Sequence, residues 1–139
     1  MGSGHPEAPA RLQAIEQRLE SSGMLAQMLR PMASAGDEAT IAGLWKGTHS
    51  ASMIARLRSL SSAAGYREID ADTRMNAHSL AAARQATALV LQAADGIARG
   101  EFQSAFCAIR PPGHHAEYAT PMGFCLINQA AVVVNYLRQ

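Results

Sequence analysis

The sequence predicts an α/β protein with a parallel sheet flanked by helices. Three consecutive segments support this class: an amphipathic helix at residues 79–99, a short apolar run at 104–109 and a longer apolar segment at 124–137. Helix, buried strand, loop and buried helix in succession are typical of folds in which parallel strands alternate with helices. By its length of 139 residues alone, the chain fits one domain.

Three helices are predicted in the first half of the chain. Pro9 favours a helix start, and apolar residues then recur at helical spacing as far as Gly23, which is a typical helix end. Two shorter helices are predicted near residues 40–46 and 50–60. A brief extended piece that runs into a loop is predicted at 66–79.

The clearest helix covers residues 79–99. Its apolar residues lie on one face and its polar residues on another, which is the pattern of a surface helix packed on something apolar. The run Ser104–Ile109, "SAFCAI", is short and bounded by polar residues, as a buried strand is. The segment 124–137 is apolar on nearly every face, so a buried helix and a β-branched strand both fit it, and we favour the helix.

Composition narrows the possible functions. Lys and Arg number 12 and Asp and Glu 11, so the net charge of +1 does not indicate nucleic acid or an anionic membrane as a partner. No apolar stretch reaches the roughly 20 residues of a membrane span, and the polar N-terminal segment does not resemble a signal peptide. The two cysteines, Cys107 and Cys125, form neither a metal-binding spacing nor a disulfide framework. We therefore expect a soluble, cytoplasmic protein.

The segment "RPPGHHAEYATPMGFC", residues 110–125, carries the candidate chemistry. It follows the carboxyl end of the predicted strand, where open α/β sheets bind ligands. Histidine exchanges protons near neutral pH, and two rings in one loop, His114 and His115, can face the same pocket. The prolines stiffen the exit from the strand, and Gly113 and Gly123 permit close backbone approach. From these residues alone, a solvated histidine pair in a surface loop stays open as the alternative.

The same segment resembles the signature of the zinc-dependent histone deacetylase superfamily, which includes the acetylpolyamine amidohydrolases. "RPPGHHAE…PMGFCLIN" carries the resemblance, which is closest to class II-like and bacterial members. Further similar stretches occur in the family's order along the chain: "HPEAPARLQAI" at 5–15, "ATIAGLWKGTHSASMIARL" at 39–57, and "IDADT" followed by "SLAAARQATA". The similarity therefore covers nearly the whole chain.

The resemblance implies roles for five residues. His114 and His115 align with tandem histidines that act beside a zinc-bound water as general base and acid. Gly123 and Phe124 align with residues that line the acetyl-lysine tunnel, Gly123 through its carbonyl and Phe124 as a ring wall. Asp72 lies in a loop where some members hold the substrate with an aspartate. The implied reaction is zinc-assisted hydrolysis of an acetyl amide in acetyl-lysine or a similar acetylated amine, or alternatively in an acetylpolyamine or another small amide.

The zinc ligands of the family have no match in this sequence. The family holds zinc with an Asp and a His of an Asp-x-Asp-x-His strand and with a distant Asp, and a tyrosine polarises the carbonyl; no residue here is assigned to these roles. We expect residues 1–139 to be the N-terminal portion of a single deacetylase catalytic domain of the arginase/deacetylase type, truncated before the zinc-ligand strand and inactive alone. The alternative is a catalytically inactive fragment or interaction module. An exposed sheet edge would favour self-association.

Overall fold

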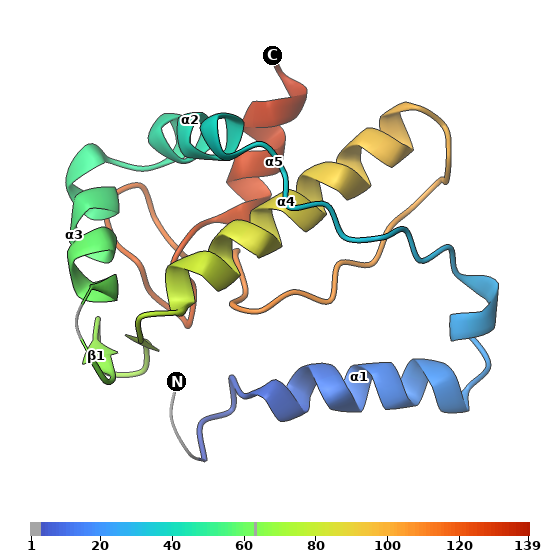
Figure 1. Ribbon diagram of the computed structural model, residues 1–139, viewed down its shortest axis with the longest axis horizontal. Coiled ribbons are helices and arrows are strands. Elements are labelled where there is room, and N and C mark those ends of the chain that lie inside the picture. The colour runs from blue at the N-terminus through green and yellow to red at the C-terminus, as the bar shows by residue number, and fades with distance from the viewer. Residues whose placement is uncertain (1–3, 63) are drawn as a thin grey trace.

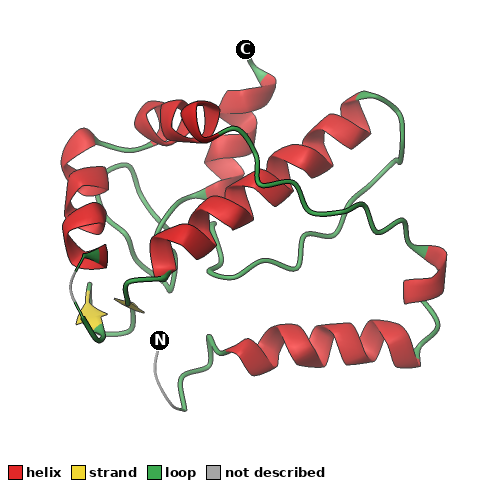
Figure 2. Ribbon diagram, in the orientation of Figure 1, coloured by secondary structure: helices red, strands yellow, loops and turns green. Residues whose placement is uncertain are grey.

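The computed structural model describes residues 4–62 and 64–139, in which helices predominate (Figure 2). The elements in chain order are α1 (Pro9–Ser21), the 3₁₀ helix η1 (Leu25–Gln27), α2 (Glu38–Thr48), α3 (Ala51–Ser61), β1 (Arg67–Glu68), β2 (Arg74–Met75), α4 (Ser79–Ala98) and α5 (Gln129–Leu137). Residues 1–3, part of the polar N-terminal segment, and residue 63 lie outside the described residues. Within the described ranges, every helix is too short or too polar to cross a membrane.

Local sequence signals set the ends of most helices. Asp37, Ser50 and Asn128 precede α2, α3 and α5, and the side chain of each accepts a hydrogen bond from a backbone N–H in the first turn. Gly23 and Gly100 follow α1 and α4, each with a φ of 72°. That left-handed conformation ends a helix and is accessible to a residue without a Cβ. The helices predicted in the first half of the chain and at 79–99 are confirmed.

The core lies among α2, α3, α4 and α5 (Figure 1). Helix α4 contacts each of the other three, and large, fully buried apolar side chains of the core are Ile41, Leu57, Met75, Leu126, Ile127 and Val132. A buried polar chain joins three of the helices as well. Trp45 Nε1 of α2 donates to Thr87 Oγ1 of α4 at 2.9 Å, and this hydroxyl donates to Gln129 Oε1 of α5 at 2.8 Å. Helix α5 is therefore fixed by both packing and hydrogen bonds.

The last helix is shorter than predicted. The apolar segment 124–137 is helical only from Gln129 to Leu137, where the choice of a helix over a strand is confirmed. The start is set by Asn128, whose side chain accepts from the Ala131 N–H at 2.9 Å. Residues 124–128 instead complete the loop that carries the two histidines.

The predicted buried strand at Ser104–Ile109 is not formed in this structure. The segment is irregular and largely exposed, with Phe106 61% exposed, and no described residue pairs with it as a strand. A strand completes its backbone hydrogen bonds only beside a neighbouring strand. The described residues supply one sheet, the antiparallel pair of β1 and β2. The parallel sheet therefore stays a prediction.

Candidate functional site

The histidine loop, residues 110–128, connects the irregular segment after α4 to the start of α5. The loop folds back on itself, because Met122 and Cys125 exchange two backbone hydrogen bonds of 3.1 and 2.9 Å. Its entry is held against α5, where the Ala130 N–H donates to the Gly113 carbonyl at 3.1 Å. The two ends of the loop are thus fixed to the same helix terminus, and the histidines lie between them.

His114 and His115 present adjacent, exposed rings on this loop. Their ring centroids are 4.1 Å apart and their planes are inclined by 47°. The His114 backbone N–H donates to the buried Cys125 Sγ at 3.4 Å. His115 packs so closely on Gly123 that a Cβ at position 123 would lie 2.7 Å from the His115 Cβ. The structure therefore places the two predicted proton carriers side by side, with His115 directly against Gly123.

Phe124 has an unusual backbone conformation beside them. Its φ is 67°, directly after Gly123 with a φ of 56°, and non-glycine residues seldom occupy this left-handed region. The Phe124 N–H donates to Thr73 Oγ1 at 3.0 Å. Its ring meets the ring of His5 edge to face, with centroids 4.7 Å apart and an interplanar angle of 78°. Two segments remote in sequence therefore hold the backbone and the ring of Phe124.

Asp72 lies in the loop between β1 and β2 and is connected to Phe124 through its neighbour. The Thr73 hydroxyl, which accepts from Phe124, donates to Asp72 Oδ1 at 2.9 Å. His5 Nε2 lies 2.9 Å from the backbone carbonyl oxygen of Asp72. The structure thus brings the exposed Asp72 into one hydrogen-bonded cluster with Phe124. The binding of a substrate by its carboxylate stays a prediction.

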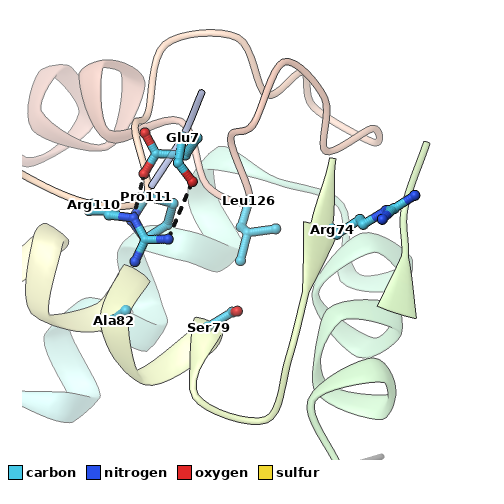
Figure 3. Close-up of a pocket in the computed structure, with 7 residues that line it drawn as sticks. All are labelled: Glu7, Arg74, Ser79, Ala82, Arg110, Pro111 and Leu126. Carbon is cyan, nitrogen blue, oxygen red and sulfur yellow. Dashed lines mark hydrogen bonds and ion pairs between the residues drawn. The ribbon is translucent and has the colours of Figure 1, made fainter. Parts of the chain in front are cut away.

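Arg110, at the start of the histidine loop, is held by a buried carboxylate. The Glu7 side chain is 3% exposed, and its Oε1 lies 2.8 Å from Arg110 Nε. The two atoms are not aligned for a hydrogen bond, so this contact is an ion pair. Figure 3 shows the two groups facing one another beside Pro111, in the wall of a cavity of about 50 Å³. Glu7 also accepts from Arg11 Nε at 2.8 Å, so one carboxylate joins α1 to the loop.

His49, the C-cap of α2, is hydrogen-bonded to the backbone of the histidine loop. Its side chain is almost fully buried, Nδ1 donates to the Glu117 carbonyl at 2.8 Å, and Nε2 accepts from the Asn128 N–H at 3.0 Å. A ring that accepts at one nitrogen and donates at the other is neutral. Burial accordingly lowers the pKa of His49, and its hydrogen bond to the Glu117 carbonyl opposes that shift only in part.

Reasoning from residue types alone did not connect these supporting residues to the histidine loop. Glu7, His49 and Thr73 are far in sequence from the loop that they contact, and no local pattern connects them to it. All three nevertheless lie in the stretches "HPEAPARLQAI", "ATIAGLWKGTHSASMIARL" and "IDADT", which carry part of the family resemblance. That resemblance is the signal that could have found them.

Among the described residues, no group of three or more His, Cys, Asp or Glu side chains is placed to hold a metal ion. The described residues therefore do not form a zinc site by themselves. The groups that can exchange protons at the exposed face of the loop are His114 and His115.

Known proteins resemble this chain along nearly its whole length. A family model described as the histone deacetylase domain matches residues 5–139. The chain is 32% identical to human histone deacetylase 7, an alignment that covers 99% of this chain and 16% of the relative. It is 30% identical to histone deacetylase 5 of Arabidopsis thaliana, with 98% and 21% covered, and 48% identical to human histone deacetylase 9 over 71 residues, with 50% and 7% covered. The chain thus spans about a fifth or less of these relatives.

The crystal structure of the HDA15 HD domain shares this arrangement of elements. It matches with a TM-score of 0.83 and 32% identity, and the match covers 99% of this chain and 38% of that chain. The predicted α/β fold of the deacetylase type is confirmed at this level.

Proposed function

The chain belongs to the histone deacetylase domain family, and from this premise we propose that it contributes the paired proton carriers of an amidohydrolase. The reaction is hydrolysis of an acetyl amide in acetyl-lysine or a similar acetylated amine. The observation that carries the proposal is the contact of the His114 and His115 rings, with centroids 4.1 Å apart, directly beside Gly123. Two adjacent rings can exchange protons with one reacting group, each ring through its own nitrogen.

The two histidines have complementary roles in this proposal. Water adds to the acetyl carbonyl carbon while an imidazole nitrogen of one histidine takes its proton. The C–N bond then breaks, and the other imidazole gives a proton to the departing amine nitrogen, so that acetate and a free amine result. Because the two rings lie in contact, one can act as the base and the other as the acid at the same reacting group. Zinc is the cofactor that the family implies, and no group of three or more His, Cys, Asp or Glu side chains among the described residues is placed to hold it.

Gly123 and Phe124 shape the approach to the histidines in this proposal. The absence of a side chain at Gly123 lets the His115 side chain pack directly against its backbone, and the Gly123 carbonyl accepts from Cys125 Sγ at 3.3 Å. Phe124, held by its backbone and ring contacts, offers an aromatic wall to the methylene chain of an acetylated amine. Asp72 supplies a carboxylate at the edge of the same cluster, where it can accept a hydrogen bond from the substrate's backbone.

The experiment measures hydrolysis of an acetyl-lysine peptide by a polypeptide that contains the whole deacetylase domain. We expect His114→Gln and His115→Gln each to lower kcat by roughly 10²- to 10⁴-fold, because each removes one proton carrier. The matched control is His78→Gln, an exposed histidine before α4 and outside the cluster, which should leave hydrolysis unchanged. Wild-type rates in both loop variants would contradict the proposal. An acetylated diamine, assayed in parallel, distinguishes small amides from acetyl-lysine as the preferred substrate.

A second candidate is an interaction module that associates through its apolar surface. The observation in its favour is a cavity of about 850 Å³ between α1, η1, α4 and the unpaired residues 102–109. Exposed apolar surface and unpaired extended backbone favour association with another chain. If the wild-type domain hydrolyses the substrate and needs His114 and His115 to do so, the amidohydrolase is supported. If the wild type shows no turnover, the interaction module is favoured.

A further inference from the structure

Phe124 needs an external hydrogen-bond acceptor to keep its backbone conformation. A φ of 67° places its Cβ near the following carbonyl, a contact that makes the left-handed region unfavourable for residues other than glycine. Phe124 is also half-buried, so its N–H must find a partner within the protein. The partner is Thr73 Oγ1 at 3.0 Å, from a residue that is completely buried and 51 positions away.

The Thr73 hydroxyl has a defined direction. A hydroxyl carries a single hydrogen, and Thr73 directs this hydrogen to Asp72 Oδ1 at 2.9 Å. Its oxygen is then free to accept from Phe124. The Thr73 backbone is fixed in turn, because its N–H donates to Asp70 Oδ1 at 2.7 Å and its carbonyl accepts from the Ile69 N–H at 2.8 Å. The hydroxyl is therefore a rigid acceptor.

His5 provides a second support that depends on the same loop. The Glu7 N–H donates to His5 Nδ1 at 3.0 Å, so Nδ1 carries no hydrogen, and the proton is on Nε2, which donates to the Asp72 carbonyl at 2.9 Å. These two bonds fix the plane of the imidazole. That ring lies edge to face with the ring of Phe124. The backbone and the ring of Phe124 are thus both positioned from residues 72 and 73.

We propose that Thr73 is a positioning residue that holds Phe124 in its left-handed conformation and couples it to Asp72. One hydroxyl joins the predicted aromatic wall and the predicted substrate-binding carboxylate. The effect on catalysis rests on the proposed function, whereas the effect on the Phe124 backbone does not.

Two substitutions separate the hydroxyl from the shape of the side chain. Thr73→Val keeps the β-branched volume and removes the acceptor, and Thr73→Ser keeps the acceptor and removes a methyl group. We expect Thr73→Val to accelerate amide hydrogen exchange at Phe124 about tenfold, which is the effect of losing one ordinary hydrogen bond. The Val132 amide, bonded to the Asn128 carbonyl in the core at 3.0 Å, is the internal reference and should be unchanged. Thr73→Ser should match the wild type at both amides.

The kinetic measurement uses an acetyl-lysine peptide and a polypeptide that contains the whole domain. Thr73→Val should raise KM more than it lowers kcat, because the wall contacts the bound substrate before and during the reaction, and Thr73→Ser should restore both constants. Three outcomes would overturn the proposal and assign Thr73 to packing alone. These are a Thr73→Val variant that unfolds, equal acceleration of exchange at the Phe124 and Val132 amides, and a Thr73→Ser variant that behaves like Thr73→Val. A wild type without turnover would refute the proposed function, while the two amides would still decide the role of Thr73.

Discussion

Helices α1 and α4 carry the same kind of amphipathic sequence and have different surroundings. Helix α4 contacts α2, α3 and α5 and buries much of its apolar face, whereas α1 buries none of its residues. The apolar side chains of α1 instead line the cavity of about 850 Å³ that residues 102–109 close on another side. Periodicity thus determines that a helix has an apolar face, but burial depends on whether a partner is present to cover it.

The same contrast divides the molecule into two regions. In the packed region, α2–α5 and the histidine loop, segments far apart in the sequence lie together (Figure 1), and their buried apolar side chains form one core. In the open region, residues 9–32 and 102–109, several large apolar side chains are exposed, among them Leu29, Met32 and Phe106. All five predicted site residues belong to the packed region or contact it. The geometry of the site therefore depends on the packed region.

The largest effect should come from creating a cavity in the packed region. Ile127, near the end of the histidine loop, is fully buried, and Ile127→Ala should lower the free energy of unfolding by about 2–5 kcal/mol. The matched change in the open region, Leu29→Ala at a side chain that is 72% exposed, should cost no more than about 0.5 kcal/mol. Urea unfolding followed by circular dichroism measures both. Equal losses would show that the two regions are packed to the same extent.

A smaller effect should come from adding a side chain where the packed region has no room for it. A Cβ on Gly113 would lie 2.2 Å from Gln129 Cγ and 2.7 Å from the Gln129 backbone nitrogen. Gly113→Ala should therefore destabilise the chain by about 1–3 kcal/mol through forced repacking at the start of α5. As a control, Gly43→Ala adds a Cβ inside α2 with no atom within 4 Å and should stabilise by roughly 0.5–1 kcal/mol. Thermal unfolding of the two variants should shift in opposite directions; a shift in the same direction would refute the close contact.

The smallest effect should be the pH dependence contributed by His49. Burial lowers its pKa below the ordinary value of 6.5, so the unfolded chain binds a proton there at a higher pH than the folded chain does. This stabilising contribution is complete above about pH 6.5 and is lost as the pH falls towards the folded pKa, with a slope of at most about 1.4 kcal/mol per pH unit. The carboxyls of Asp37 and Glu101, whose pKa values are lowered by hydrogen bonds from Thr40 and Arg99, contribute only at lower pH.

Urea unfolding at pH 7.5 and at pH 5.5 measures this contribution. The His49→Gln variant should be less stable than the wild type at pH 7.5, because the carbonyl of Glu117 and the N–H of Asn128 lose well-placed partners. Its stability should then fall less between the two pH values. An unchanged pH dependence in the variant would show that the buried ring is not the group responsible.

Much of the fold and the positions of the site residues could be predicted from the sequence. The spacing of apolar residues located the helices. Their ends are explained by the capping side chains of Asp37, Ser50 and Asn128 and by the glycines after α1 and α4, because these signals act within one turn of the chain. The loop of His114 and His115 stood out from its residue types. The short apolar run at 104–109 was misleading, since a strand pattern describes one partner of an interaction and contains no information about the other.

The sequence by itself determined which segments are helical, which residues can exchange protons and which family the chain resembles, since these depend on local patterns or on an ordered set of motifs. Only the tertiary structure decided that Glu7 holds Arg110, that His49 is neutral beneath the loop and that Thr73 fixes Phe124. Each of these contacts joins positions 51 to 103 residues apart. Such contacts form because a buried polar group must find a partner wherever folding places one.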